Sequence, residues 1–481
     1  MNKTISNIFF NVAYQILTLA IPLITAPYIA RTLGPESVGI YSYSTSVASI
    51  FAVFMLLGVA NYGSRSIALV SCQGKGSISK VFWEIYCLQL TISVVVIACY
   101  CCYVGFCVRE YATALWCQMF YLISVLLDIS WIYVGLGEMR IAVVRGIIVK
   151  IIQAVAIFLF VKVQSDTAKY ILIIAIGALI GNVLLWLCVK KYVGLSKIKF
   201  CDVIKHLKPN LILFLPLIAS SLFMYMDKIM LKWISGDLVD VGIYEYAEKI
   251  VRLPLGVISA IGAVMMPKVA SVIAESKNSS LTKYMNISMR YIGILAVGMC
   301  CGVFAIAPEL ATVYLGSEFS EAGQLMQYMS VIIALSAFAN IIRTQLLIPL
   351  KRDKEYSLSI ITGAVVNTVM NCLLIPEFGS LGAAIGTICA EAAIFILHIL
   401  FVRKEIDVFK YLVEWILFGV VGCIMVVTVR VISIYLSTNV WGLLAEICIG
   451  FTVYMILSLI GLLVQRDEYI NKLLWRFKRR K

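Results

Sequence analysis

Residues 168–189 read AKYILIIAIGALIGNVLLWLCV, and this stretch decides the fold class. It holds one charged residue, Lys169, close to its start. Because a membrane-spanning helix needs about 20 mostly apolar residues, the stretch predicts one crossing of a lipid bilayer. The whole chain has this character: 62% of its 481 residues are hydrophobic and 14% are charged, against roughly 45–50% and about 25% in soluble domains. These values exclude a cytosolic enzyme, a secreted disulfide scaffold, a nucleic-acid-binding domain and a disordered tail.

Thirteen further stretches resemble the first, so we expect an all-α polytopic membrane protein with about fourteen transmembrane helices; twelve is the alternative count. The predicted spans are 7–30, 38–62, 81–104, 113–135, 141–163, 168–189, 209–234, 240–266, 285–306, 323–349, 356–376, 380–402, 410–436 and 441–464. The predicted organisation is an N-terminal lobe of six helices, a basic cytoplasmic linker, a C-terminal lobe of six helices, and two extra helices with a basic tail. Their respective ranges are 1–189, 190–208, 209–402 and 403–481.

The basic residues fall on one side of this arrangement. With a cytoplasmic N-terminus, 28 Lys and Arg lie in predicted cytoplasmic segments, Arg140 and Arg145 among them, and 5 lie on the other side. Positive charge gathers on the cytoplasmic side of membrane proteins, and a missed helix would invert every later loop. The separation therefore predicts an even number of spans with both termini in the cytoplasm.

A short internal repeat relates the two predicted lobes. Val38-Gly39-Ile40-Tyr41-Ser42-Tyr43 recurs as Val241-Gly242-Ile243-Tyr244-Glu245-Tyr246, and Ile21-Pro22-Leu23 is matched by Leu215-Pro216-Leu217. The copies lie six predicted helices apart, and an even spacing gives both the same orientation. We therefore expect parallel repeats, related by an axis along the membrane normal, with a cleft between the two lobes and Tyr41 and Tyr244 at equivalent positions.

Charged side chains inside predicted spans are costly in lipid and usually face protein or a watery cavity. Lys150 is mid-span in 141–163, Arg343 is in the inner half of 323–349, and neither has an opposite charge within one turn. Both are predicted to face a water-filled cleft that suits an anionic substrate. The predicted substrate-binding cations are Lys150, Arg343, Lys249, Arg252, Arg290 and Arg31, and the predicted ion-coupling or gating acids are Asp128, Asp227, Glu245 and Glu248.

A structural role is the alternative for this set. Glu245 and Lys249, like Glu248 and Arg252, are four residues apart and can form ion pairs on one helix face. Charges near span ends, such as Arg290, can reach the interface. The charges of the span 240–266 fit either role.

The chain lacks the sequence motifs of nucleotide chemistry and of metal sites. No P-loop, G-x-S-x-G or D-x-D is present, so ATP hydrolysis and a nucleotide-sugar site are not expected. The 15 cysteines are scattered and mostly lie inside spans, where a small apolar role is typical. We therefore predict no cofactor, no metal and no enzymatic activity, and any transport must draw on an ion gradient, the membrane potential or the substrate's own gradient.

Three loose motifs in the right order carry a resemblance to a known family. They are Pro22-x4-Pro27-Tyr28-x2-Arg31-x-Leu33-Gly34-Pro35-x3-Gly39-x-Tyr41, then Asp128-Ile129-Ser130-Trp131 with Gly137-Glu138, then Tyr225-x-Asp227-Lys228 through Gly242-x-Tyr244-x2-Ala247-x-Lys249-Ile250 to Pro267. The chain resembles the bacterial polysaccharide flippases of Wzx type, which handle O-antigen or capsule repeat units. They belong to the multidrug/oligosaccharidyl-lipid/polysaccharide exporter superfamily.

The resemblance implies two six-helix lobes that work by alternating access. It implies flipping of an undecaprenyl-diphosphate-linked oligosaccharide across the cytoplasmic membrane through a cationic cavity, with membrane lipid and other polysaccharide-assembly proteins as further partners and no nucleic acid. Three alternatives stay open: a peptidoglycan-precursor flippase, a multidrug exporter of the same superfamily, and a membrane polysaccharide polymerase or ligase. An exporter of organic cations should show an excess of intramembrane acids. Polymerases and ligases carry a large extracytoplasmic loop, whereas the longest predicted outer loop, about 307–322, is short and acidic.

Overall fold

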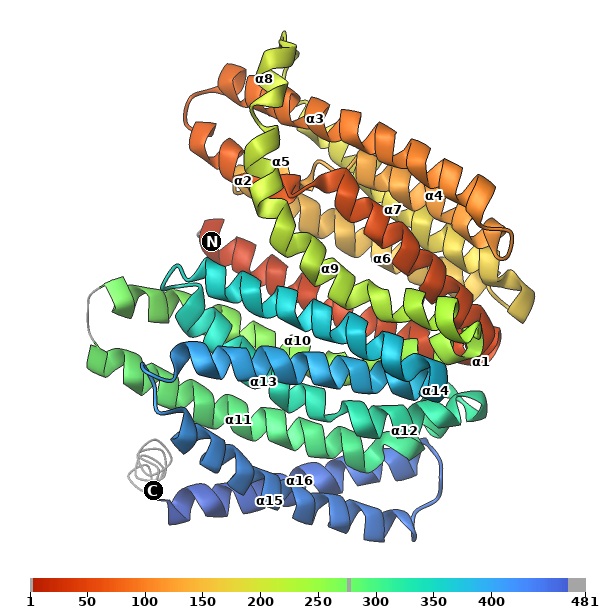
Figure 1. Ribbon diagram of the computed structural model, residues 1–481, viewed down its shortest axis with the longest axis vertical. Helices are drawn as coiled ribbons and strands as arrows, with labels where there is room; N and C mark the ends of the chain where they lie inside the picture. Colours follow the sequence, from red (N-terminus) through yellow and green to blue (C-terminus); the bar gives the residue numbers. More distant parts are fainter. Residues whose placement is uncertain (1–2, 275–277, 466–481) are drawn as a thin grey trace. The chain divides into compact units, whose positions relative to one another are not determined.

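The computed structural model describes residues 3–274 and 278–465 (Figure 1), and every regular element within these ranges is a helix. The predicted all-α polytopic class is confirmed. Lys277 and nearly all of the predicted basic tail lie outside the described residues. The chain divides into two compact units, which we call the N-terminal unit, Met1–Glu245, and the C-terminal unit, Tyr246–Lys481. The lobe boundaries at 189 and 209 stay a prediction.

The N-terminal unit is built from long helices joined by short turns. Its elements are α1 (Lys3–Leu56), α2 (Val59–Val70), α3 (Lys75–Cys102), η1 (Tyr103–Cys107), α4 (Ala112–Leu126), α5 (Ser130–Gly135), α6 (Met139–Phe160), η2 (Gln164–Asp166), α7 (Thr167–Val189), α8 (Phe200–Ile204) and α9 (Leu207–Ser235). Helix α4 packs on α7, α6 packs on α1 and α7, and α9 packs on α1.

The C-terminal unit has the same character. Helix α10 (Leu238–Ala274) begins in the N-terminal unit and continues into this one, and is followed by α11 (Asn278–Glu309), η3 (Leu310–Leu315), η4 (Ser317–Phe319), α12 (Ser320–Met329), α13 (Val331–Ile342), η5 (Arg343–Leu347), α14 (Asp353–Val402), α15 (Val408–Ser433) and α16 (Val440–Val464). The predicted outer loop at about 307–322 is therefore helical through most of its length.

Two very long helices are each interrupted by a glycine. In α1, Gly34 has φ 74° and ψ 172°, a conformation that glycine adopts without the penalty of a side chain. Pro35 follows directly and suits the first turn of a new helix. In α14, Gly379 has φ 53° and ψ −128°. Each break falls in a gap between two predicted spans, so the chain turns there almost without a loop.

The described chain has ten or eleven helices that could cross a membrane. Ten helices of the described chain are long and apolar enough to cross a membrane, or eleven if the bent pair Ser317–Met329 and Val331–Leu347 is one span. The 54 residues of α1 would extend about 80 Å at 1.5 Å per residue, far more than a hydrocarbon core of about 30 Å. An unbroken crossing is therefore excluded for α1, and the predicted count of fourteen stays a prediction.

The two copies of the sequence repeat cross each other where α1 meets the start of α10. A Cβ atom built on Gly39 would lie 1.9 Å from the carbonyl oxygen of Leu238, and one built on Gly242 would lie 1.9 Å from that of Pro35. The hydroxyl of Ser42 donates to Glu245 Oε2 at 2.8 Å. The two glycines that hold the second position of each repeat copy therefore lie close together, and the residues at the fifth position, Ser42 and Glu245, are hydrogen-bonded to each other. Small residues permit this close backbone approach between membrane helices.

The last two helices are anchored on α11 in the C-terminal unit. The indole N–H of Trp415 in α15 donates to the Met289 carbonyl at 2.8 Å, and the hydroxyl of Tyr454 in α16 donates to the Ile294 carbonyl at 2.8 Å. Arg430 of α15 lies 2.8 Å from Glu309. The segment predicted as two extra helices is therefore an integral part of its unit.

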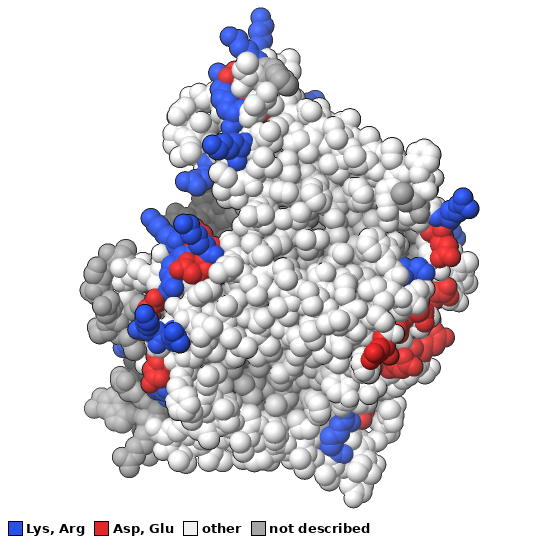
Figure 2. Space-filling model, viewed as in Figure 1, with Lys and Arg blue, Asp and Glu red and all other residues white. Residues whose placement is uncertain are grey.

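Charged side chains gather at helix ends on the visible face of each unit, and the surface between them is white (Figure 2). Large apolar side chains away from the helix ends are exposed, for example Ile180, Ile212, Leu373 and Phe451. Exposed apolar surface of this extent is expected where lipid hydrocarbon is the solvent. The protein is therefore a multi-pass membrane protein.

Candidate functional site

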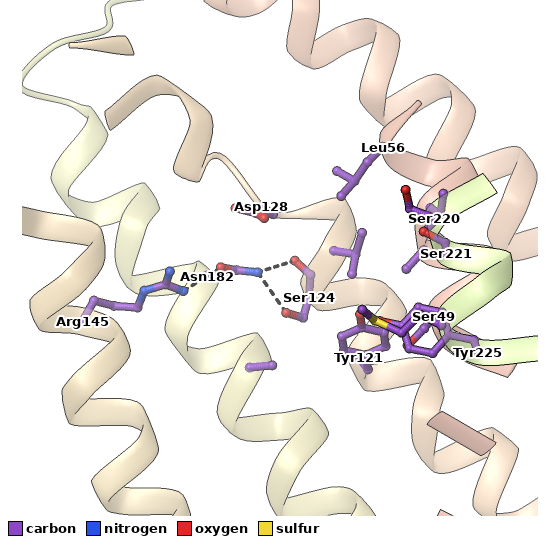
Figure 3. Close-up of a pocket in the computed structure, with 15 residues that line it drawn as sticks. Ser49, Leu56, Tyr121, Ser124, Asp128, Arg145, Asn182, Ser220, Ser221 and Tyr225 are labelled. Atoms are coloured by element: carbon purple, nitrogen blue, oxygen red, sulfur yellow. Dashed lines mark hydrogen bonds between the residues drawn. The ribbon is translucent and has the colours of Figure 1, made fainter. Parts of the chain in front are cut away.

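A cavity of about 370 Å³ lies inside the N-terminal unit, within the size range of roughly 300–1,000 Å³ typical of small-molecule sites. Its wall combines side chains from α1, α4, α6, α7 and α9 (Figure 3). The polar members are Ser49, Tyr121, Ser124, Asp128, Arg145, Asn182, Ser220, Ser221 and Tyr225, and the apolar members are Ala52, Val53, Leu56, Val125, Ala178 and Met224. Carbon makes up most of the surface between the polar groups.

The break between α4 and α5 brings Asp128 to this cavity. Backbone carbonyls released at the break are satisfied by the fully buried Gln89 of α3, whose amide donates to Val125 at 3.3 Å and to Asp128 at 3.0 Å. The indole of Trp186 donates to the Leu127 carbonyl at 2.9 Å. Asp128 Oδ1 in turn accepts the backbone N–H of Ser130 at 2.8 Å, at the start of α5. Aspartate side chains often accept a backbone N–H two residues further on, which stabilises a turn.

A chain of hydrogen bonds across three helices fixes Arg145. Its Nη1 donates to Asn182 Oδ1 at 2.8 Å, and Asn182 Nδ2 donates to the backbone oxygen and the hydroxyl of Ser124 at 2.8 and 2.9 Å. The Nε atom of Arg145 is buried and has no hydrogen-bond partner in the described chain. A guanidinium has five N–H donors, and the bond to Asn182 uses one of them.

Sequence reasoning placed Arg145 in a cytoplasmic segment and so missed it. The available signal was its position four residues inside the predicted span 141–163. Asp128, predicted as an ion-coupling or gating acid, does line the cavity. Lys150, the preferred cation of the same helix, is partly exposed and is not among the lining residues. Five residues on from Arg145 it points about 140° away around the axis, at 100° per residue.

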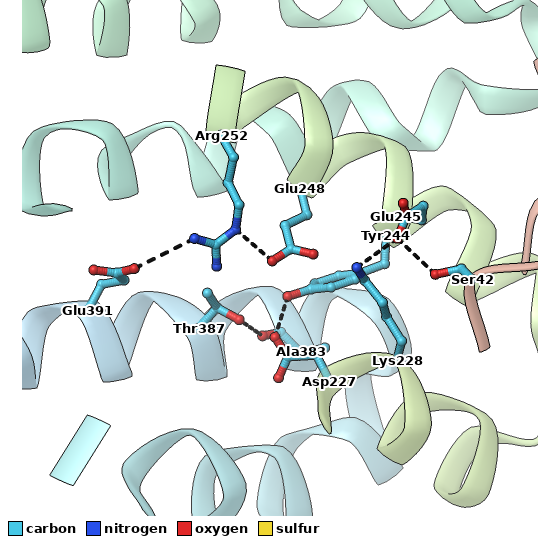
Figure 4. Close-up of polar contacts among 10 residues, drawn as sticks. All are labelled: Ser42, Asp227, Lys228, Tyr244, Glu245, Glu248, Arg252, Ala383, Thr387 and Glu391. Atoms are coloured by element: carbon cyan, nitrogen blue, oxygen red, sulfur yellow. Dashed lines mark hydrogen bonds and ion pairs between the residues drawn. The ribbon is translucent and has the colours of Figure 1, made fainter. Parts of the chain in front are cut away.

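The predicted acids Asp227 and Glu245 each have an identified partner in the N-terminal unit (Figure 4). The buried hydroxyl of Tyr244 donates to Asp227 Oδ2 at 2.6 Å, and Lys228 Nζ lies 2.7 Å from Glu245 Oε2. Asp227 is 1% exposed. A buried carboxylate is tolerated when it is hydrogen-bonded or paired. The contacts with Tyr244 and Lys228 are therefore sufficient to stabilise Asp227 and Glu245 inside the protein.

In the C-terminal unit, Arg252 lies between two carboxylates. Its Nε is 2.7 Å from Glu248 Oε1, which forms the predicted i,i+4 pair, and its Nη1 is 4.0 Å from Glu391 Oε1 (Figure 4). Lys249 Nζ lies 5.5 Å from the centre of the Tyr246 ring, a cation–π distance.

Arg343 begins the π-helical turn η5 in the same unit. Its Nη2 donates to Asn340 Oδ1 at 2.8 Å, and its guanidinium carbon lies 5.8 Å from the centre of the Tyr356 ring. Arg343 Nε is buried, and neither it nor the side-chain amide of Gln345 has a hydrogen-bond partner among the described residues. Turns of π-helix are frequent at functional sites, and buried polar atoms without partners call for a ligand, an ion or water.

The two remaining predicted cations lie in different surroundings. Arg290 of α11 donates two hydrogen bonds to the carboxylate of Glu414 in α15, from Nε at 3.2 Å and from Nη2 at 2.6 Å. Such a two-pronged contact favours the structural reading of Arg290. Arg31 is exposed on α1, shortly before the break at Gly34. Their predicted role in substrate binding stays a prediction.

A helical bundle that crosses the membrane many times and holds a polar cavity within one unit has the architecture of a membrane transporter. The chain belongs to the polysaccharide biosynthesis protein family, whose model matches residues 4–273. The family predicted from the motifs is confirmed. The model of lipid II flippase MurJ also matches, over residues 147–452.

The similarity to individual relatives covers nearly their whole length. A Shigella dysenteriae protein named "Putative O-antigen transporter" is 28% identical over 80% of this chain and 95% of its own, and an Escherichia coli protein of the same name is 22% identical over 83% and 96%. Among solved structures, a lipid II flippase MurJ in an inward closed conformation has a TM-score of 0.74 at 16% identity, covering 96% of this chain and 100% of that one. An inward-facing multidrug transporter of the MATE family has a TM-score of 0.63. These likenesses show a shared fold.

Proposed function

We propose that this protein is a flippase that moves a polyprenyl-diphosphate-linked oligosaccharide across the bacterial cytoplasmic membrane for surface polysaccharide biosynthesis. The observation that carries the proposal is membership of the polysaccharide biosynthesis family together with nearly full-length similarity to proteins named as O-antigen transporters. A cavity whose wall carries hydroxyl, amide and charged groups fits a substrate with a hydrophilic head. Other polysaccharide-assembly proteins are proposed partners, and both chain termini are proposed to lie in the cytoplasm.

The physical task is to carry a charged head group through hydrocarbon. A diphosphate bears about two negative charges, and moving it bare across a core of about 30 Å is prohibitive. Fixed cations in a watery passage lower that barrier, because Coulomb attraction is stronger at low effective dielectric. Alternating access then exposes the head group first to the cytoplasmic side and later to the outer side. Dispersed cations suit this task better than a tight cage, since the head group must also leave.

Lys150, in the N-terminal unit, and Arg343, in the C-terminal unit, are each proposed as a contact of the diphosphate. Arg343 carries the stronger structural support, because its identified hydrogen-bond partner is a neutral amide and its Nε is buried without a partner in the described chain. Lys249 and Arg252 are proposed to receive the head group later, when the contact between Arg252 and Glu248 opens.

Charge substitutions test these contacts. Arg343→Glu and Lys150→Glu should each lower surface polysaccharide at least about tenfold, since reversing one charge near a dianion costs well over 1.4 kcal/mol at an effective dielectric near 20. Asn340→Asp is the sharper variant, because it keeps the shape of the Arg343 partner and places a carboxylate there that compensates the charge of the guanidinium. Arg65→Glu, at an exposed arginine of α2, is the matched control. Normal export by variants present at wild-type membrane levels would show that these cations are structural.

Deletion in the host tests the function itself. We expect loss of surface polysaccharide and accumulation of lipid-linked oligosaccharide on the cytoplasmic face, restored by the intact gene on a plasmid. Unchanged polysaccharide in the deletion strain would refute the proposal.

Flipping of a peptidoglycan precursor is the second candidate. It is favoured by the match to the lipid II flippase model over residues 147–452 and by the shared fold. Expression in a bacterium depleted of its own lipid II flippase separates the two functions: rescue of growth supports the second candidate, and failure to rescue supports the first.

A further inference from the structure

The cavity of the N-terminal unit has a chemical character different from that of a diphosphate site. It presents one guanidinium, Arg145, and one carboxylate, Asp128. A dianion would be repelled by Asp128, and an organic cation would be repelled by Arg145. The two formal charges cancel, so the cavity favours a neutral polar ligand over either ion.

Hydroxyl groups dominate the rest of the polar wall. Figure 3 shows Arg145 and Asn182 on one side of the cavity, Ser220 and Ser221 on the other, and Asp128 between them. Guanidinium, carboxylate, amide and hydroxyl groups together offer donors and acceptors in several directions. A ligand with many hydroxyl groups, each both donor and acceptor, matches that arrangement.

The apolar part of the wall supports the same ligand class. Tyr121, Tyr225 and Met224 line the cavity together with small apolar side chains, and carbon makes up most of the lining. A sugar ring has a carbon–hydrogen face that packs on aromatic rings and polar edges that hydrogen-bond, and tyrosine offers both kinds of contact. A volume of about 370 Å³ accommodates roughly one or two such rings.

The polar groups are held in place and keep bonding capacity. Asn182 and Ser124 position Arg145, which lines the cavity, and the bond to Asn182 uses one of its five N–H donors. Among the described hydrogen bonds, the contact with Ser130 uses Oδ1 of Asp128, and no bond uses Oδ2. A site whose groups are fixed before binding loses less entropy when the ligand arrives.

We propose that this cavity binds a neutral sugar of the transported oligosaccharide, with Arg145 and Asp128 hydrogen-bonding its hydroxyl groups and Tyr121 and Tyr225 packing on its ring. This inference rests on the proposed flippase function. It adds to that function a site that recognises the sugar and that is distinct from the cations proposed to bind the diphosphate. Sugar recognition here gives the transporter a means to select its repeat unit.

The test uses the full-length protein in lipid nanodiscs and saturation-transfer-difference NMR with glucose, galactose and N-acetylglucosamine as probes. We expect saturable transfer from at least one sugar, and no displacement by inorganic pyrophosphate. Arg145→Gln should weaken binding about tenfold, as loss of a charge-assisted hydrogen bond does. Ser221→Leu should abolish binding by filling the cavity, whereas Ser71→Leu, at a partly exposed serine just after α2, should leave binding unchanged.

Three results would overturn the inference: no saturable transfer from any of the three sugars, transfer that survives Ser221→Leu, or displacement of the sugar by pyrophosphate. Asp128→Asn is a variant of the cavity that should still fold, because asparagine can accept the Ser130 N–H. It should keep the wild-type melting temperature, so any change in its sugar binding cannot be attributed to misfolding. The host deletion separates this inference from the function: unchanged polysaccharide there refutes the flippase, while binding lost in Ser221→Leu still identifies a sugar site.

Discussion

Replacing Gly39 by alanine tests the crossing of the two repeat copies. The added Cβ would lie 1.9 Å from the Leu238 carbonyl oxygen, whereas ordinary contact begins at 3.4 Å. The helices must therefore separate by about 1.5 Å, the difference between these distances. The neighbour is backbone, so no side chain can rotate away to relieve the clash.

The cost follows from two contributions. Overpacking of a tight site costs about 1–3 kcal/mol, and separation also weakens the hydrogen bond from Ser42 to the Glu245 carboxylate, a bond of a kind worth about 1.5–3 kcal/mol. A loss of about 2–3 kcal/mol should lower the apparent melting temperature by roughly 5–10 °C, on the scale of larger soluble domains. Gly242→Ala should have a similar effect, because its Cβ meets the Pro35 carbonyl oxygen at the same distance.

The assay is size-exclusion chromatography of detergent-solubilised protein after heating, with Gly419→Ala as the control. A Cβ at Gly419 meets nothing within 4 Å, so alanine there should be neutral or slightly stabilising, since it is the better helix former. In the double variant Gly39→Ala/Gly242→Ala, the second substitution should cost less than it does alone, because the first has already opened the crossing. A Gly39→Ala protein that melts together with Gly419→Ala would refute the close approach.

Three further predictions address topology and packing. Reporter fusions at Lys199 and Ser317 should lie on opposite faces of the membrane, with Ser317 outside; both on one face would contradict the fourteen-span topology. Arg290→Glu should lower the melting temperature and the exchange Arg290→Glu/Glu414→Arg should recover part of the loss, as the two-pronged contact requires; absence of recovery would show that the two side chains do not pair. Gln89→Leu should cost about 1–3 kcal/mol by leaving buried carbonyls unsatisfied at the α4–α5 break, and an unchanged melting temperature would show that water takes its place.

Local chemistry made much of the fold predictable. The adjacent Gly34 and Pro35 allow a sharp break between two apolar stretches, and the structure has that break inside α1. The repeat was also recognisable in the amino-acid sequence, since Gly39 and Gly242 occupy the same position in their copies. That the copies lie against each other was not predictable, because spacing along one helix gives no register with another.

The candidate site shows the same limit. Arg145 was missed because a cation near a span end is ordinarily read as reaching the interface, and its fixing by Asn182 depends on the register of α6 against α7. Arg290 was selected as a cation inside a span, but Glu414 lies 124 residues further along the chain, where no sequence spacing rule links the two. Partners on other helices decide the role of a buried charge, and only tertiary structure supplies them.

The partners sort the intramembrane arginines into two kinds. Arg252 and Arg290 contact carboxylates, so much of their charge is already compensated. Arg145 and Arg343 are each oriented by the side-chain oxygen of an asparagine at 2.8 Å, and each has a buried Nε without a partner in the described chain. A neutral amide fixes the direction of a guanidinium without cancelling its charge, and that charge stays available for a ligand. The two have different acidic neighbours: Asp128 lines the cavity of Arg145, which suits the neutral sugar proposed for that site, and the buried Glu391 interacts electrostatically with Arg343. With a sugar proposed at Arg145 and a diphosphate proposed at Arg343, the same Arg–Asn arrangement, present in both units, is proposed to serve the two chemically distinct parts of one amphipathic substrate.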